Sequence, residues 1–144
     1  MINTIAVIAC IVLFIVIWAL IDAFFFRRKL LKISTSRPAL NRFDFIDKME
    51  LEGFEYDKIV ATYDAIKELL QLDEFHIYPT DNLLKLYKMD DLDIYEMIVQ
   101  LCEQLEVNYP SQEQHDEVFQ LNNENFDTIF ILRLLHQGNP VKKQ

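Results

Sequence analysis

Apolar residues are distributed along this chain in two different ways. Residues 5–21 contain no charged side chain, and the apolar run resumes at Ala23–Phe26 after a single aspartate, Asp22. Beyond residue 38, apolar residues recur every three or four positions among many polar ones. The first pattern predicts a membrane-spanning helix, which needs about 20 apolar residues. The second predicts amphipathic helices around a small core.

We expect residues 1–26 to form a single transmembrane anchor. The hydrocarbon core offers no hydrogen-bond partner to backbone amides, so a lone spanning segment has to be helical. A cleaved signal peptide would begin with basic residues and have a shorter apolar core. Met1–Thr4 contains no basic residue. Val7–Cys10 is a poor lipoprotein cleavage box, because most of the apolar run follows Cys10.

Basic residues follow the anchor and none precedes it. The membrane-flanking residues are Asp22, Arg27, Arg28, Lys29 and Lys32. Because basic flanks are retained in the cytoplasm, the sequence predicts a single-pass protein with a cytoplasmic C-terminal domain. Two interpretations of Asp22 stay open: its side chain reaches the headgroup region or Arg28, or it contacts a membrane partner.

The rest of the chain predicts an all-α fold. Residues 27–53 are expected to form a basic juxtamembrane linker and an amphipathic helix, Leu40–Leu51, that packs on the domain or lies on the membrane. Residues 54–138 are expected to form the helical domain, and residues 139–144 a frayed tail.

Four helices are expected within the domain. In chain order they are Tyr56–Leu72, Leu92–Leu105, a short helix after Ser111, and Phe126–His136. A long loop, Asp73–Lys88, joins the first two. Asp90 suits the N-cap of the second helix, Ser111–Gln114 has the spacing of a capping box, and Gly138 is placed to cap the last helix.

The net charge of −9 conceals two oppositely charged regions. Residues 1–37 contain five basic residues and one acidic residue, a charge of +4, whereas residues 38–144 contain nine basic and 22 acidic residues, a charge of −13. An acidic domain does not favour nucleic acid, whose affinity is dominated by phosphate contacts. It favours basic protein partners and is repelled by an anionic membrane surface.

No sequence pattern indicates catalysis, a metal or a cofactor. The acidic residues near position 90 lack the glycine and later glutamate of a calcium loop. The three histidines lack zinc-ligand spacing, and Cys10 and Cys102 have no Cys or His neighbour at such spacing. There is no glycine-rich phosphate loop, and no serine or cysteine lies in a motif that suggests activation by histidine. We therefore expect a protein that is not an enzyme.

Three short segments resemble acyl carrier proteins. Ile77–Leu83 is similar to the family's loop pattern of Ile, Pro and Leu, and Val107–Pro110 resembles its apolar-x-Ile-Pro turn. Asp90–Asp93 stands where the modification motif belongs. The resemblance covers Tyr56–His136 and implies a small acyl-carrier-like four-helix bundle. The chain is also similar to short enterobacterial acyl-carrier-like proteins that lack the serine, which implies a bacterial inner membrane.

The chain departs from the family at the attachment site. Asp91 replaces the serine that would carry phosphopantetheine, and a carboxylate cannot form that phosphodiester. Lys88 replaces the glycine that the family usually has two residues before the aspartate, here Asp90. The nearest downstream serine is Ser111, a whole helix away. The resemblance thus implies the fold of an acyl carrier protein without the phosphopantetheine arm.

By the same resemblance, the acidic second helix binds a protein with a basic surface or a membrane complex. The predicted partner-binding residues are Asp90, Asp91, Leu92, Asp93, Ile94, Glu96 and Met97. An equally open interpretation is that the acids only solubilise the helix and stabilise its N-terminus. Two other functions also stay open: a structural subunit acting through its transmembrane helix, and a true carrier modified elsewhere.

Overall fold

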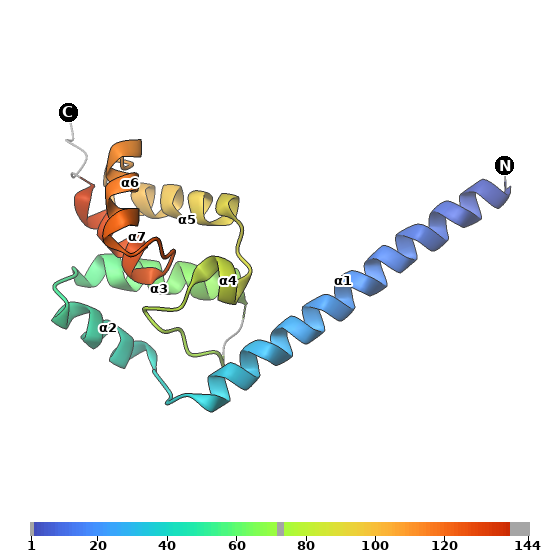
Figure 1. Cartoon of the computed structure of the whole chain (residues 1–144), viewed down its shortest axis with the longest axis horizontal. Coiled ribbons are helices and arrows are strands. Elements are labelled where there is room, and N and C mark those ends of the chain that lie inside the picture. The colour runs from blue at the N-terminus through green and yellow to red at the C-terminus, as the bar shows by residue number, and fades with distance from the viewer. Residues whose placement is uncertain (1, 72–73, 139–144) are drawn as a thin grey trace. The chain divides into compact units, whose positions relative to one another are not determined.

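A computed structural model describes residues 2–71 and 74–138 of the chain (Figure 1). Within these ranges the chain forms seven helices and no strand, which confirms the all-α prediction. The chain divides into two compact units, Met1–Ala39 and Leu40–Gln144. The predicted tail, 139–144, lies outside the described residues.

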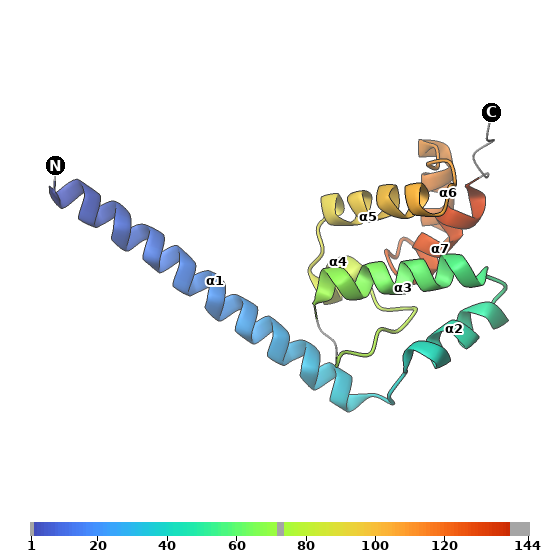
Figure 2. The same ribbon diagram turned by 180° about the vertical axis from the view of Figure 1, so that it is seen from behind.

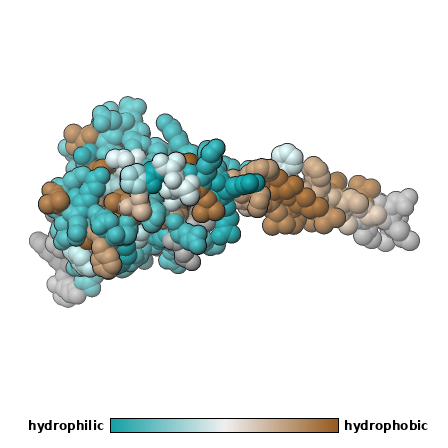
Figure 3. Space-filling model, turned by 90° about the horizontal axis from the view of Figure 1, so that it is seen from below, coloured by the Kyte–Doolittle hydropathy of each residue, from teal (hydrophilic) through white to brown (hydrophobic). Residues whose placement is uncertain are grey.

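The first unit is one long helix, α1, which runs over Ile2–Ser36. Among the described residues it is the helix that is long and apolar enough, by length and composition, to cross a membrane. At a rise of 1.5 Å per residue its 35 residues span about 50 Å, whereas the hydrocarbon core is about 30 Å thick. Its side chains from Ala6 to Phe25 are all exposed, with Trp18 at 67%, and most of its visible surface is hydrophobic (Figure 3).

The basic segment after the apolar run, where a linker was expected, continues the helix as far as Ser36. Lys, Arg and Leu are good helix formers, and two hydroxyls bond within the helix: Thr35 Oγ1 to the Lys32 carbonyl at 3.0 Å and Ser36 Oγ to the Ile33 carbonyl at 2.8 Å. The helix ends at Ser36. Pro38 follows, and a proline disfavours the helical conformation in the residue before it.

The second unit begins with α2, Arg42–Leu51, which packs on α3, Tyr56–Leu70. Asn41 caps α2 by accepting a hydrogen bond from the Asp44 amide at 3.0 Å. Phe45, Ile46 and Met49 are buried. The compact unit therefore starts at Leu40 rather than at residue 54, because α2 supplies part of its core.

Four helices follow α3. They are α4 (Leu83–Tyr87), α5 (Asp91–Gln104), α6 (Gln112–Leu121) and α7 (Thr128–Gln137). The central helix is α3, which contacts α2, α5 and α7, while α6 packs on α7. The two opposite views agree that α3 lies between α2 and α5 (Figures 1 and 2).

The short helix α4 lies inside the segment that was expected to be a loop. The Asn82 side chain accepts a hydrogen bond from the Lys85 amide at 2.7 Å and starts the helix. Lys88, with φ 56°, ends it in the left-handed conformation. The predicted end of the preceding helix, Leu72, lies outside the described residues.

The last helix begins two residues later than predicted and ends on a glycine with an unexpected conformation. Asp127 sets the start, because its carboxylate accepts a hydrogen bond from the Phe130 amide at 2.9 Å. Gly138 caps the end through its amide, but with extended rather than left-handed backbone. A Cβ there would lie 2.9 Å from the Asn108 carbonyl oxygen, so close approach of two backbone segments requires the glycine.

Candidate functional site

The acidic motif forms the first turn of α5. Asp90 is the N-cap, which confirms the prediction, and its carboxylate accepts a hydrogen bond from the Asp93 amide at 2.8 Å. Asp93 returns the bond by accepting from the Asp90 amide at 3.1 Å. Two aspartates thus make a reciprocal capping box. Asp91 is the first residue of the helix.

Five of the seven predicted partner-binding residues are accessible. They are Asp90, Asp91, Leu92, Asp93 and Glu96, and the Leu92 side chain is 61% exposed. Ile94 and Met97 are only 3% and 2% exposed. Ile94 lines a hollow beside Asp91 and Met97 lines one beside Glu96, so their contact with a partner stays a prediction. Their spacing places them on the core-facing side of α5, where they continue the buried row through Ile98 and Leu101.

The acidic surface extends across a groove to α3. A hollow of about 330 Å³ separates the two helices, with Asp93 and Glu96 on the α5 side and Glu68 and Leu69 on the α3 side. Glu68 is exposed, so carboxylates face the groove from both helices. Sequence reasoning missed Glu68, because only the pairing of α3 with α5 brings it beside the motif.

A second hollow lies beside Asp91. It has a volume of about 340 Å³, and its lining combines Asp91 with Tyr95, Tyr109, His115 and Phe126. The His115 ring packs edge-on against the buried Phe130 ring at 5.3 Å. The sequence pattern gave no reason to associate the turn after α5 or helix α6 with Asp91.

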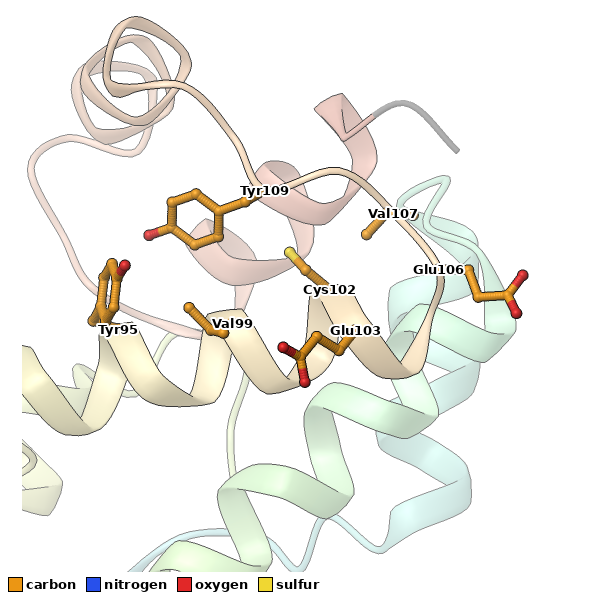
Figure 4. Close-up of a pocket in the computed structure, with 7 residues that line it drawn as sticks. All are labelled: Tyr95, Val99, Cys102, Glu103, Glu106, Val107 and Tyr109. Atoms are coloured by element: carbon orange, nitrogen blue, oxygen red, sulfur yellow. The ribbon is translucent and has the colours of Figure 1, made fainter. Parts of the chain in front are cut away.

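A larger groove follows the C-terminal half of α5 (Figure 4). Its volume is about 570 Å³. The rings of Tyr95 and Tyr109 stand near one end with centroids 5.6 Å apart and planes inclined at 61°. Burial, and to a smaller degree neighbouring Tyr95, raises the pKa of Tyr109. Burial also raises the pKa of the Cys102 thiol, which keeps the floor of the groove uncharged at neutral pH.

The residues predicted to flank the membrane all lie on α1. Asp22, Arg27, Arg28, Lys29 and Lys32 are all exposed. Among the described residues, no group of three or more His, Cys, Asp or Glu side chains could hold a metal ion. No family model, curated protein or solved structure matches the chain.

Proposed function

We propose that this chain is a non-catalytic, membrane-anchored protein whose acyl-carrier-like domain binds a protein partner through the acidic start of α5. One observation carries the proposal above all. Asp91 occupies the first position of α5, exposed to solvent, and the reciprocal Asp90–Asp93 cap fixes the turn that presents it. A surface held rigidly before binding loses little conformational entropy when a partner docks.

The order of elements supports the carrier-like part of the proposal. Helix α3 is followed by a long connection, then by α5, the shorter α6 and finally α7, the order that the resemblance implies. Lys88 adds a second argument, because it has φ 56° at the position where the family usually has glycine. Glycine adopts this left-handed conformation without steric cost, so the backbone there suits the family's residue.

The acidic character of the surface supports a basic protein as the partner. Asp91, Asp93 and Glu96 lie on α5, and Glu68 lines the α3–α5 groove together with Asp93 and Glu96. Electrostatic complementarity of this kind raises the rate of encounter and selects among partners. The same charge disfavours binding to anionic lipid, and Asp91 cannot carry phosphopantetheine. The remaining candidate for modification, Ser111, caps α6 by accepting a hydrogen bond from the Gln114 amide at 3.3 Å.

The proposed location is the bacterial inner membrane, with α1 crossing it once and the helical domain in the cytoplasm. The basic residues from Arg27 to Lys32 support this orientation through the positive-inside rule. Protease added outside spheroplasts should leave residues 40–144 intact. Digestion of the domain without lysis would reverse the orientation.

The partner surface can be tested by cross-linking pull-down from native membranes with two charge-matched variants. Asp91→Lys/Glu96→Lys changes the proposed surface but spares the capping box. Glu113→Lys/Glu117→Lys changes the charge by the same amount on α6, also with one residue in the first helical turn, and all four side chains are exposed. We expect the first variant to lose its native partner and the second to retain it.

Two results would refute this proposal. Equal capture by both charge-reversed variants would remove the surface on α5. Loss of capture only when α1 is exchanged for an unrelated membrane helix would instead assign binding to the anchor.

A further inference from the structure

The groove along the C-terminal half of α5 is chemically different from the acidic start of the helix. Its floor is apolar: Val99 and Cys102 come from α5, and Val107 from the turn that follows. Cys102 and Val107 are 4% and 9% exposed, so they belong to the fixed core. Figure 4 shows Val99 and the Cys102 sulfur on the helix, below the ring of Tyr109.

Two half-exposed tyrosine rings form the wall at one end of this groove. Tyr95 is 52% and Tyr109 45% exposed. Their edge-to-face contact restricts the orientation of both rings. Tyrosine is enriched among the residues that dominate binding energy at protein interfaces. At about 570 Å³ the groove has room for a large side chain, within the range of about 300–1,000 Å³ of ligand pockets.

The charged side chains that line the groove are both acidic. Glu103 is exposed on α5, and Glu106 lies at the end away from the tyrosines (Figure 4). Leu92, Glu96, Val99 and Glu103 are spaced by three or four residues and therefore share the outer side of α5. The acidic start of the helix and the apolar groove thus form one continuous surface in which acids flank apolar positions.

We propose that this groove receives an apolar anchor side chain, aromatic or large aliphatic, from a partner segment in which lysine or arginine flanks the anchor. Charge complementarity with Glu103 and Glu106 selects a cationic segment, and the apolar floor selects the anchor. This inference rests on the proposed function and names the partner's chemistry. Burial of the apolar side chain supplies most of the affinity, and the acids on either side select the charge of the segment that carries it.

The test uses the full chain in nanodiscs of neutral lipid and three synthetic hexapeptides as probes. The probe Lys-Lys-Phe-Leu-Lys-Lys carries both features. Lys-Lys-Ser-Ser-Lys-Lys lacks the anchor, and Glu-Glu-Phe-Leu-Glu-Glu has the opposite charge. Backbone amide chemical shifts of the chain report where each peptide binds and, on titration, how tightly.

We expect only the first peptide to shift the amides around Tyr95, Val99 and Tyr109 in a saturable manner. Val99→Ser and Tyr109→Ser should each weaken its binding at least tenfold. Leu121→Ser, which changes a 63% exposed leucine on α6, should leave binding unchanged. The two groove variants are needed together because Tyr109 also packs on Tyr95, whereas Val99→Ser disturbs less of the fold.

Three outcomes would overturn the inference: no saturable shifts, equal shifts with all three peptides, or shifts that map elsewhere. Failure here is distinguishable from failure of the proposed function. If Asp91→Lys/Glu96→Lys loses its native partner but no peptide binds the natural chain, only the inference about the groove is refuted. If the first peptide binds the groove but Asp91→Lys/Glu96→Lys still captures its native partner, the proposed function of the α5 start is refuted.

Discussion

Asp90 and Asp93 hold each other in place across the first turn of α5, each carboxylate accepting a hydrogen bond from the other residue's amide at 2.8 Å and 3.1 Å. The two residues between them, Asp91 and Leu92, are therefore presented on a fixed backbone. The acids also face the positive end of the helix dipole, which stabilises them. Asp90 and Asp93 therefore both stabilise the start of α5 and belong to the proposed binding surface.

Removing the cap should destabilise the helical domain measurably. Asp90→Ala leaves the Asp93 amide without its acceptor, and loss of an N-cap side chain costs about 1 kcal/mol. Glu96→Ala, an exposed change on the same helix without a capping role, should stay within about 0.5 kcal/mol. Urea unfolding followed by near-ultraviolet circular dichroism measures the difference, because all six tyrosines lie in residues 40–144. Equal effects of the two changes would show that the cap contributes nothing.

Replacing Lys88 by glycine should stabilise the same domain. A non-glycine residue in the left-handed conformation is strained by roughly 1–2 kcal/mol. Glycine removes this strain but costs about 0.5–1 kcal/mol, because its unfolded state has more conformational entropy. The expected net gain in unfolding free energy is about 0.5–1 kcal/mol. Lys88→Ala is the matched control, since it removes the same side chain but keeps the Cβ. A gain from alanine as large as that from glycine would exclude backbone strain as the cause.

Two phenylalanines of α2, one buried and one exposed, should differ in their contribution to stability. Phe45 is fully buried and its ring lies 5.0 Å from that of Tyr63 on α3, so Phe45→Ala should cost about 3–5 kcal/mol. Phe43, two residues earlier, is 74% exposed, and Phe43→Ala should change stability by less than about 0.5 kcal/mol. The same urea unfolding assay compares them. If both were neutral, α2 would be an independent linker element.

Stability should fall at alkaline pH, in part through Tyr63. Burial raises the pKa of this phenol above its ordinary value, although nearby Arg42 opposes the shift. Below about pH 10 the phenol is neutral in both folded and unfolded chains, and its contribution is fully present. As the pH rises further, the unfolded chain ionises first and the unfolding free energy declines. Tyr63→Phe should flatten this decline, and parallel pH profiles for the two chains would contradict it.

Local patterns were sufficient to predict much of this fold. The long N-terminal helix was predicted from its unbroken apolar run. The second and third domain helices and the caps at Asp90 and Ser111 were predicted because each depends on residues within a few helical turns. The helix α4 and the left-handed Lys88 were not, because a five-residue helix inside an apolar loop has no clear period. The packing of α2 on the domain depends on tertiary contacts, such as that of the buried Phe45 ring with Tyr63, which the sequence does not reveal.

The candidate site was predicted only in part, because some of its residues are brought together by tertiary contacts. The exposed acids follow from the amphipathic pattern of α5, whereas Ile94 and Met97, which were predicted to contact a partner, are almost fully buried. Glu68 and Tyr109 come near the motif only through helix pairing and the turn after α5. A one-dimensional pattern identifies a helix face but not the neighbours of that face.

The central claim is that the start of α5 has the shape of a carrier's modification site but lacks the nucleophile. The most direct measurement is the intact mass of the full chain and of its Asp91→Ser variant after incubation with a broad-specificity phosphopantetheinyl transferase and coenzyme A. We predict no mass change for the natural chain and the gain of one phosphopantetheine arm for the serine variant. Modification of the natural chain, or a serine variant that stays unmodified, would contradict the account.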